Sequence, residues 1–347
     1  MYRPVEVASE EERQRFCALA PAPLDPATVS RQRPDAMLLL GDAARCSLWW
    51  RHTAPYESHR LGYVGHYAAG DARAAPELLG AACNRLAAEG CTLAVGPMDG
   101  STWQRYRFVT ERGSEPPFFL EPDNPDDYPA QWTDFGFTPL AEYSSAVNSD
   151  LSAQDPRLTA TAQCVHDLGI AVHALDPGRF DEELRHVHAL SLVSFRDNFL
   201  YTPLSEADFL AQYVPLRPHL RPDLVLLAER RGELVGYLLA VPDLLRARRG
   251  EPMNTVIFKT MAVHPDCGGL GLGSLLMART HEAARKAGFT HAIHALMHEA
   301  NRSGRISGHT ARVFRRYTLY SRPLTKEEEL ATDEHSEAVE IPNEPEA

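Results

Sequence analysis

The chain has 347 residues, of which 44% are apolar and 24% charged, a composition typical of a globular protein large enough for two domains. No stretch approaches the roughly 18 consecutive apolar residues of a membrane-spanning helix, and the N-terminus is charged, so we expect a cytoplasmic protein without a signal peptide. The six cysteines form no C-x-x-C pair and no histidines cluster at zinc-ligand spacing, so no metal is expected.

The net charge of −12 is concentrated at the C-terminus. Residues 325–347 hold nine acids and one lysine, which leaves the rest of the chain close to neutral. This segment has too little apolar surface to offset the entropy of ordering, so we predict a disordered acidic tail. The near-neutral body has no basic stripe with aromatics, so neither nucleic acid nor a membrane is expected as a partner.

The first half contains a strand–helix–strand unit. Residues 61–67 and 92–95 are predicted strands, and residues 75–88 between them form a predicted helix. The polar and aromatic segment 96–107 fits a pocket-lining loop and an ordinary surface loop equally well. A polar stretch with a proline near residues 150–160 then predicts a domain boundary, which gives domains at 1–155 and 156–324.

The second half opens with helical and hairpin patterns. Residues 180–194 have helical periodicity, and Ser205 with Asp208 can cap another helix. Residues 224–227 and 234–241 are predicted to form a hairpin with a glycine in its turn.

A second strand–helix–strand unit follows at residues 255–263, 273–287 and 291–296. Sliding the chain on itself by 198 residues aligns it with the first unit without a gap, and places His66 over His264. Right-handed crossovers make the strands of each unit parallel. The fold class is therefore α/β with a mixed sheet, and an internal repeat is favoured over a chance likeness of two α/β segments.

The turn after residues 255–263 is rich in glycine. A helix N-terminus carries roughly half a positive charge on unpaired N–H groups, and glycines let the backbone approach a phosphate. The Rossmann spacing fails because Ser274 or Leu276 stands where its last glycine would be, and no lysine is present for a P-loop. The pattern predicts a pyrophosphate ligand other than NAD, ATP or GTP.

A strand, then Val263-x-Pro265, then Gly271-Leu272-Gly273 opening a helix resembles the acetyl-CoA motif of the GNAT superfamily of N-acetyltransferases. Gly268 stands where that family has Gln or Arg, which removes one side-chain contact but keeps the backbone cradle. The resemblance covers residues 165–322 and implies acetyl-CoA as co-substrate. The implied cofactor-binding residues are Met261, Ala262, Val263, Gly268, Gly269, Leu270, Gly271, Leu272, Gly273, Ser274 and Asn301.

The repeat and the resemblance together imply two tandem GNAT-like (acyl-CoA N-acyltransferase) domains. In the first copy Asp71 lies opposite Gly269, and a carboxylate there would repel a phosphate. The first copy is therefore predicted to be degenerate and to have a structural or substrate-shaping role.

The resemblance also implies direct attack of a substrate amine on the thioester in a ternary complex, with one group accepting a proton and another protonating the thiolate. His298 and Glu299 are the base candidates, and an exposed pair at a strand end is the alternative. Tyr317 and His309 are the acid candidates, and core packing is the alternative for Tyr317. Asn301 either contacts CoA, as in the family, or caps a helix.

The family binds its acceptor with the loop between the first two helices, although an ordinary helix connection would look the same. The acceptor is expected to be a small-molecule or peptide amine, and a homodimer is kept as an option. Two other functions fit: a non-catalytic acyl-CoA-binding sensor or interaction module, and an aminoacyl-tRNA-dependent transferase of similar fold. The substrate-binding candidates are Phe195, Arg196, Asn198 and Tyr201.

Overall fold

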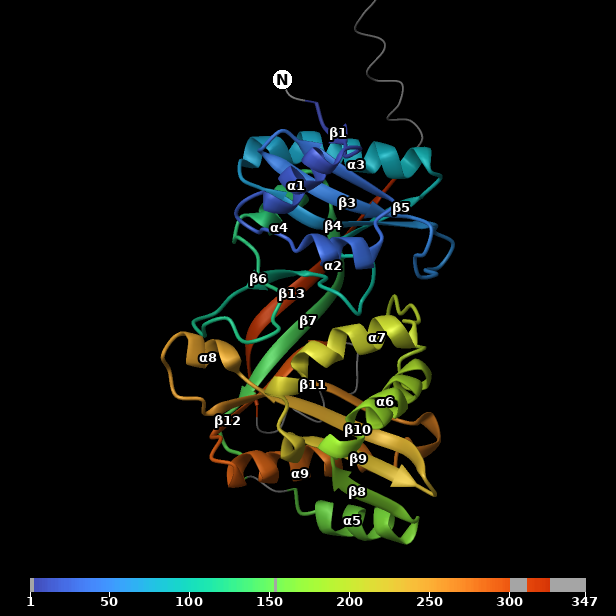
Figure 1. Ribbon diagram of the computed structural model, residues 1–347, viewed down its shortest axis with the longest axis vertical. Helices are drawn as coiled ribbons and strands as arrows, with labels where there is room; N and C mark the ends of the chain where they lie inside the picture. Colours follow the sequence, from blue (N-terminus) through green and yellow to red (C-terminus); the bar gives the residue numbers. More distant parts are fainter. Residues whose placement is uncertain (1–2, 153–154, 300–310, 325–347) are drawn as a thin grey trace, which may run out of the picture. The chain divides into compact units, whose positions relative to one another are not determined.

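The computed structural model describes residues 3–152, 155–299 and 311–324. These residues form two compact units, each assembled from separate stretches of the chain (Figure 1). The first unit gathers residues up to 100 with 130–138 and 321–324, and the second gathers 101–129 and 139–320. No single cut separates the units, so the domains 1–155 and 156–324 stay a prediction. The predicted acidic tail lies outside the described residues.

The first unit contains five strands in the order β1-β2-β3-β4-β5, with the last pair parallel and the others antiparallel. Helix α3 makes the crossover from β4 to β5 and contacts β2, β3 and β4. The strands are β1 (Val5–Glu6), β2 (Ala36–Leu40), β3 (Ala44–Trp49), β4 (Leu61–Ala69) and β5 (Leu93–Gly96). The helices are α1 (Glu10–Ala18), α2 (Pro26–Gln32), α3 (Ala75–Ala88) and α4 (Tyr128–Asp134).

The second unit contains a mixed sheet in the order β13-β7-β12-β11-β10-β9-β8, and β6 pairs with β13. The parallel pair is β11 and β12, which α9 connects. The strands are β6 (Phe108–Glu111), β7 (Thr138–Asn148), β8 (Ile170–Ala174), β9 (Val225–Arg230), β10 (Glu233–Pro242), β11 (Thr255–Val263), β12 (His291–His298) and β13 (Arg312–Pro323). The helices are α5 (Leu158–Asp167), α6 (Phe180–Ser194), α7 (Glu206–Tyr213), α8 (Leu244–Arg248) and α9 (Leu272–Lys286).

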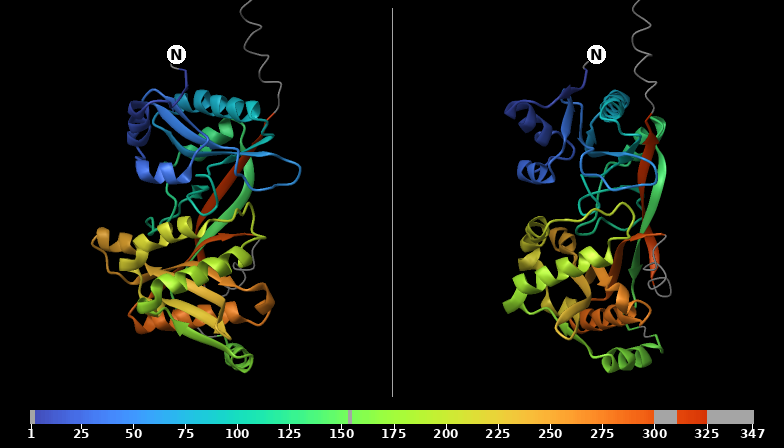
Figure 2. Two further views of the ribbon diagram at one scale, coloured as in Figure 1. Left: turned by 45° about the vertical axis from the view of Figure 1, so that its right-hand side comes forward. Right: turned by 90° about the vertical axis from the view of Figure 1, so that its right-hand side faces the viewer.

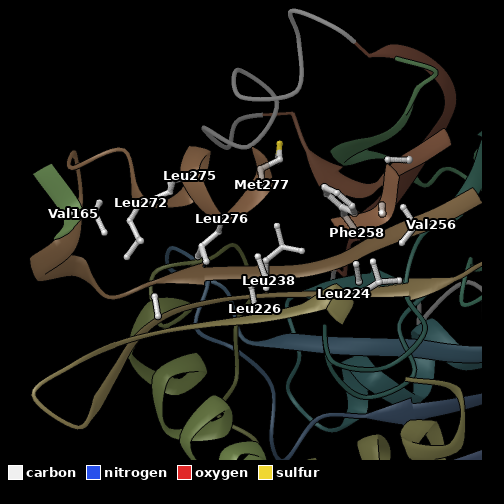
Figure 3. Packing of buried hydrophobic residues seen from close by; sticks show 14 of the residues in the cluster. Val165, Leu224, Leu226, Leu238, Val256, Phe258, Leu272, Leu275, Leu276 and Met277 are labelled. Atoms are coloured by element: carbon white, nitrogen blue, oxygen red, sulfur yellow. The ribbon is translucent and has the colours of Figure 1, made fainter. Parts of the chain in front are cut away.

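Alternating side chains of β10 bury the two faces of this sheet. Leu238 and Ala240 belong to a core with α9 and α5, whereas Tyr237 and Leu239 belong to a core with α6 and α7. The two views of Figure 2 show these helices on opposite sides of the strands. In Figure 3, leucines of α9 point onto β10 and its neighbours. The sheet is therefore a middle layer held by two apolar cores.

The predicted elements are largely confirmed. Helices α3 and α6 have the predicted bounds, and the Ser205 hydroxyl accepts a hydrogen bond from the Asp208 N–H at the start of α7. β9 and β10 form the predicted hairpin, with Arg231 and Gly232 in the left-handed region at its turn.

The constant 198-residue offset of the repeat is wrong for the strands. Leu61 of β4 pairs with Leu93 of β5, and Thr255 of β11 pairs with His291 of β12 in the equivalent place. The offset between β4 and β11 is therefore four residues shorter than the offset between β5 and β12. Three of these four residues lie in the turn before the helix, which spans residues 70–74 in one copy and 264–271 in the other, and the fourth lies in the helix, which has 14 residues in α3 and 15 in α9. His66 therefore lies inside β4 and does not correspond to His264.

Within the described ranges, no helix is both long and apolar enough to cross a bilayer.

Candidate functional site

The glycine-rich turn carries β11 into α9. Gly271 is the N-cap residue in the left-handed conformation (φ 77°), and none of the described side chains caps the first N–H groups of α9. Gly269 is also left-handed (φ 81°), and a Cβ added to it would meet no atom within 4 Å. The turn thus has open space at Gly269, close to a helix N-terminus whose dipole favours an anion, whereas a Cβ added to Gly271 would lie 2.8 Å from the Thr161 side chain.

The two parallel strands that flank α9 separate halfway along their length. Their ladder runs from Thr255 and His291 to Phe258 and His294 and then ends, although β11 continues to Val263 and β12 to His298. The opposite edge of β11 stays paired with β10, and the opposite edge of β12 with β7. The facing edges therefore have backbone groups with which an extended ligand can pair.

A cavity of about 890 Å³ opens where these strands separate. Residues 257–263 of β11 and 294–298 of β12 form one part of its lining. Residues 102–107 and 118–123, from two loops that flank β6, form another. The predicted cofactor residues Met261, Ala262 and Val263 therefore line the cavity, whereas the turn at 268–274 lies outside its lining.

His298 is the base candidate that lines the cavity. Its ring packs edge-on against Tyr143, with centroids 4.8 Å apart, and also contacts Phe199 at 5.6 Å. Burial, followed by the positive charge of Arg107, lowers the pKa of His298 below its usual value near 6.5, while Glu299 acts in the opposite direction. The imidazole is therefore neutral at pH 7 and able to accept a proton.

The other catalytic candidates lie elsewhere. Glu299 is absent from the cavity lining, and its carboxylate pairs with Arg316. Tyr317 is fully buried and also absent from the lining. His309 and Asn301 lie outside the described residues.

The hydroxyl of Tyr317 belongs to a buried network. It donates to Glu121 Oε1 (2.5 Å) and shares a hydrogen bond with the Ser145 hydroxyl (3.0 Å). Glu121 also lies 2.9 Å from Arg315 Nε, an ion pair without hydrogen-bond alignment. Ser145 Oγ in turn accepts from the N–H of Leu296, a residue of β12 with φ 59°. This network holds the part of β12 that borders the cavity.

Three of the four substrate-binding candidates line the cavity: Phe195, Asn198 and Tyr201. Arg196 is not in the lining; it is exposed and lies 3.5 Å from Asp197. The Ser194 hydroxyl, at the end of α6, donates to the carbonyl of Val263 (3.2 Å) and so ties this loop to the separated part of β11.

Residues 189–305 match the family model of the acetyltransferase (GNAT) family. The chain carries a GNAT domain. No curated protein matches the chain at a significant level.

Solved structures resemble the chain across nearly its whole length. A probable N-acyltransferase from Enterococcus faecalis V583 gives a TM-score of 0.56 at 10% identity, over 93% of this chain and 72% of that one. The GCN5-related glucosamine N-acetyltransferase region of a fungal multi-domain GH3 beta-N-acetylglucosaminidase gives a TM-score of 0.55 at 12% identity, over 93% of this chain and 38% of that one. A GCN5-related N-acetyltransferase from Anabaena variabilis ATCC 29413 gives a TM-score of 0.53 at 8% identity, over 93% of this chain and 73% of that one. At these identities the likeness shows the fold alone.

Several residues that line the cavity come from segments for which the sequence motifs predict no functional role. The loop at 102–107 contributes Trp103, whose ring contacts Tyr201 and whose Nε1 donates to the Thr202 carbonyl (2.8 Å). Tyr106 and Arg107 follow in the same loop, and Glu121 comes from the next one. Their aromatic and charged composition was the available signal, but it did not separate a pocket from a surface loop.

The corresponding place in the first copy is closed. Beyond the ladder of β4 and β5, the Met98 N–H donates to the Val64 carbonyl (2.9 Å), and the His66 N–H donates to Asp99 Oδ1 (2.6 Å). A Cβ on Gly65 would come within 2.2 Å of the Met98 carbonyl oxygen. These strands therefore have no gap in which a ligand could bind.

Proposed function

We propose that this chain transfers an acetyl group from acetyl-CoA to the amine of a small acceptor, by direct attack within a ternary complex. The observation that carries the proposal is the cavity at the separation of β11 and β12, with a neutral histidine on its wall and an uncapped helix N-terminus beyond the same strand. The match to the GNAT family supports the same reaction class.

The backbone groups would hold the cofactor. In this proposal the N-terminus of α9 would hold the pyrophosphate, next to the open space at Gly269. The edge of β11 at Met261 to Val263, which β12 leaves, would supply backbone groups that could pair with the amides of the pantetheine arm. This would direct the thioester toward the cavity.

His298 would accept the proton of the attacking ammonium, directly or through water. Its lowered pKa keeps it neutral in the pH range where most amines are protonated. The neutral amine would attack the thioester carbon and form the C–N bond, the C–S bond would break, and the departing thiolate of CoA would take up, through solvent, the second proton that the nitrogen loses. Tyr317 is a poor source for the thiolate proton, because burial raises its pKa and its hydroxyl already donates to Glu121.

A screen of amines with the full-length protein tests this function, with release of the CoA thiol as the readout. We expect thiol release that depends on both acetyl-CoA and an amine. Acetyl-CoA binding without turnover of any amine would favour the sensor function. Absence of acetyl-CoA binding would contradict the proposal and favour aminoacyl transfer.

A further inference from the structure

A buried cation, Arg107, borders the cavity without a counterion among the described residues. Arg107 is 5% exposed and borders the cavity. Its Nε and Nη1 are buried and make no hydrogen bond, and among the residues that the structure describes no carboxylate pairs with it. A guanidinium stays charged at any physiological pH, so burial of this group without a counterion is unfavourable.

Two tyrosine rings fix the position of this cation. Arg107 Cζ lies 4.0 Å from the ring centroid of Tyr106 and 4.1 Å from that of Tyr143, and the two rings are nearly perpendicular. The backbone of Arg107 is left-handed (φ 70°), a conformation that non-glycine residues rarely adopt. Cation–π contacts stabilise a guanidinium but do not satisfy its N–H donors. The site is therefore built around a charge that it does not neutralise.

The acids that border the cavity are already paired with other arginines. Glu121 contacts Arg315, and Asp123 contacts Arg112 at 2.8 Å. Another buried polar group on the wall is the Tyr201 hydroxyl, which makes no hydrogen bond with any of the described residues. An anion in the cavity would therefore meet a guanidinium and a hydroxyl to which the described residues supply no hydrogen-bond acceptor.

Arg107 and His298 contact the same aromatic ring. The Tyr143 ring lies 4.1 Å from Arg107 Cζ and 4.8 Å from the His298 ring. An anionic group bound at Arg107 would place an amine a few bonds away next to the His298 imidazole. This spacing suits one small molecule that carries both groups.

We propose that the acceptor is an amine that also carries a carboxylate, and that Arg107 binds this carboxylate. The inference rests on the proposed function, because it names the substrate class of that site. A carboxylate matches a single guanidinium in charge and accepts its planar N–H donors. The Tyr201 hydroxyl supplies a further donor.

Matched pairs of acceptors test the proposal with the full-length protein. Each pair is an amino acid and its primary amide, assayed for thiol release from acetyl-CoA. We expect kcat/KM to be about 100-fold higher for the carboxylate, because loss of a buried charge-assisted hydrogen bond has an effect of this order. Equal rates for the two members of every pair would overturn the proposal.

The variant Arg107→Gln should lower kcat/KM for the carboxylate much more than for the amide, so that the two members of each pair react at about the same rate. Arg107→Lys should recover part of the preference, since it restores the charge without the planar donors. Arg217→Gln is the matched control, because Arg217 also lies over an aromatic ring, that of Phe180, but does not border the cavity. A preference that survives in Arg107→Gln, or that Arg217→Gln removes equally, would contradict the role of Arg107.

Calorimetry in the presence of CoA separates this inference from the proposed function. The wild-type protein should bind the amino acid and not its amide, whether or not turnover occurs. Absence of thiol release with every amine would refute the acetyltransferase function alone. Tighter binding of phosphate-bearing amines than of carboxylates would overturn the substrate class.

Discussion

The two strand–helix–strand units of this chain have the same order of elements, but they differ at the two places where a cofactor would bind. In the first unit, residues 70–74 connect β4 to α3, and Asp71 there pairs with Arg73. In the second unit, residues 264–271 form a longer turn with two left-handed glycines. The strands of the first unit also close around Met98, whereas those of the second separate around a cavity.

This difference teaches that the crossover alone does not make a cofactor site. In both copies a parallel pair of strands buries an apolar core against a helix, and this burial does not require a gap between the strands. A cofactor site additionally needs a turn with room for phosphates and strand ends without backbone partners. Both features are present in the second copy alone, within the part of the chain that the structure describes.

The largest expected effect comes from a charge placed in the glycine-rich turn. Gly269→Asp adds a carboxylate where a side chain meets no atom, and Asp tolerates the left-handed conformation. Two charges about 4 Å apart near a surface repel by roughly 4 kcal/mol, so we expect acetyl-CoA affinity to fall by about 1000-fold in calorimetry. Gly269→Asn has the same shape without the charge and should stay within about threefold of wild type.

The same substitution in the other copy sharpens the comparison. Gly70→Asp lies in the turn of the first unit, where the nearest atom to an added Cβ is 3.8 Å away. It should leave acetyl-CoA affinity unchanged. A loss equal to that of Gly269→Asp would mean that the turns are functionally equivalent.

The next effect concerns the proton acceptor. His298→Ala should lower kcat by about 100-fold or more with an unchanged Kd for acetyl-CoA, as expected for removal of a general base. Glu299→Gln should change kcat by less than about threefold, because its carboxylate pairs with Arg316 and does not line the cavity. A large fall in kcat for Glu299→Gln together with a small change for His298→Ala would identify Glu299 as the base.

The closed strands of the first copy predict an effect on stability. Gly65→Ala would push a Cβ against the Met98 carbonyl, and we expect the free energy of unfolding to fall by about 2–3 kcal/mol in urea titrations. By register, Lys259 is the corresponding residue of β11; it borders the cavity, and Lys259→Ala should cost less than about 1 kcal/mol. A loss of less than about 0.5 kcal/mol for Gly65→Ala would mean that the strands of the first copy are not closed there.

The smallest expected effect is a shift of the pH–rate profile. Because burial and Arg107 hold the pKa of His298 below 6.5, kcat/KM should stay constant at neutral pH and fall only as the pH drops through that lowered pKa. Arg107→Gln removes a positive charge, so the pKa of His298 rises and the acidic limb moves to higher pH. An acidic limb above pH 6.5 in the wild-type protein would contradict the assignment of His298.

Periodicity and capping predict the local elements of this fold well. The bounds of α3 and α6 follow from their apolar spacing, and the start of α7 follows from Ser205. The glycine-rich turn is likewise a local signal. Local patterns therefore predict the crossover, which the structure confirms, whereas the cofactor-binding residues of the turn stay a prediction.

The acceptor side could not be predicted in this way, because it depends on pairings between distant residues. Strand β7 lies next to β12, about 150 residues further along the chain, and this pairing brings Tyr143 to His298. The burial of Arg107 depends on the same pairing of β7 with β12, because the guanidinium packs against the rings of Tyr106 and Tyr143. The unequal turns also explain why a gapless alignment of the two copies misplaced His66.

The stoichiometry of acetyl-CoA binding tests the difference between the two copies most directly. Calorimetry on the full-length wild-type protein and on Gly269→Asp measures both the number of sites and their location. The account predicts one molecule of acetyl-CoA per chain for the wild type and none for Gly269→Asp at the same concentrations. Two sites in the wild type, or one site that survives in the variant, would contradict it.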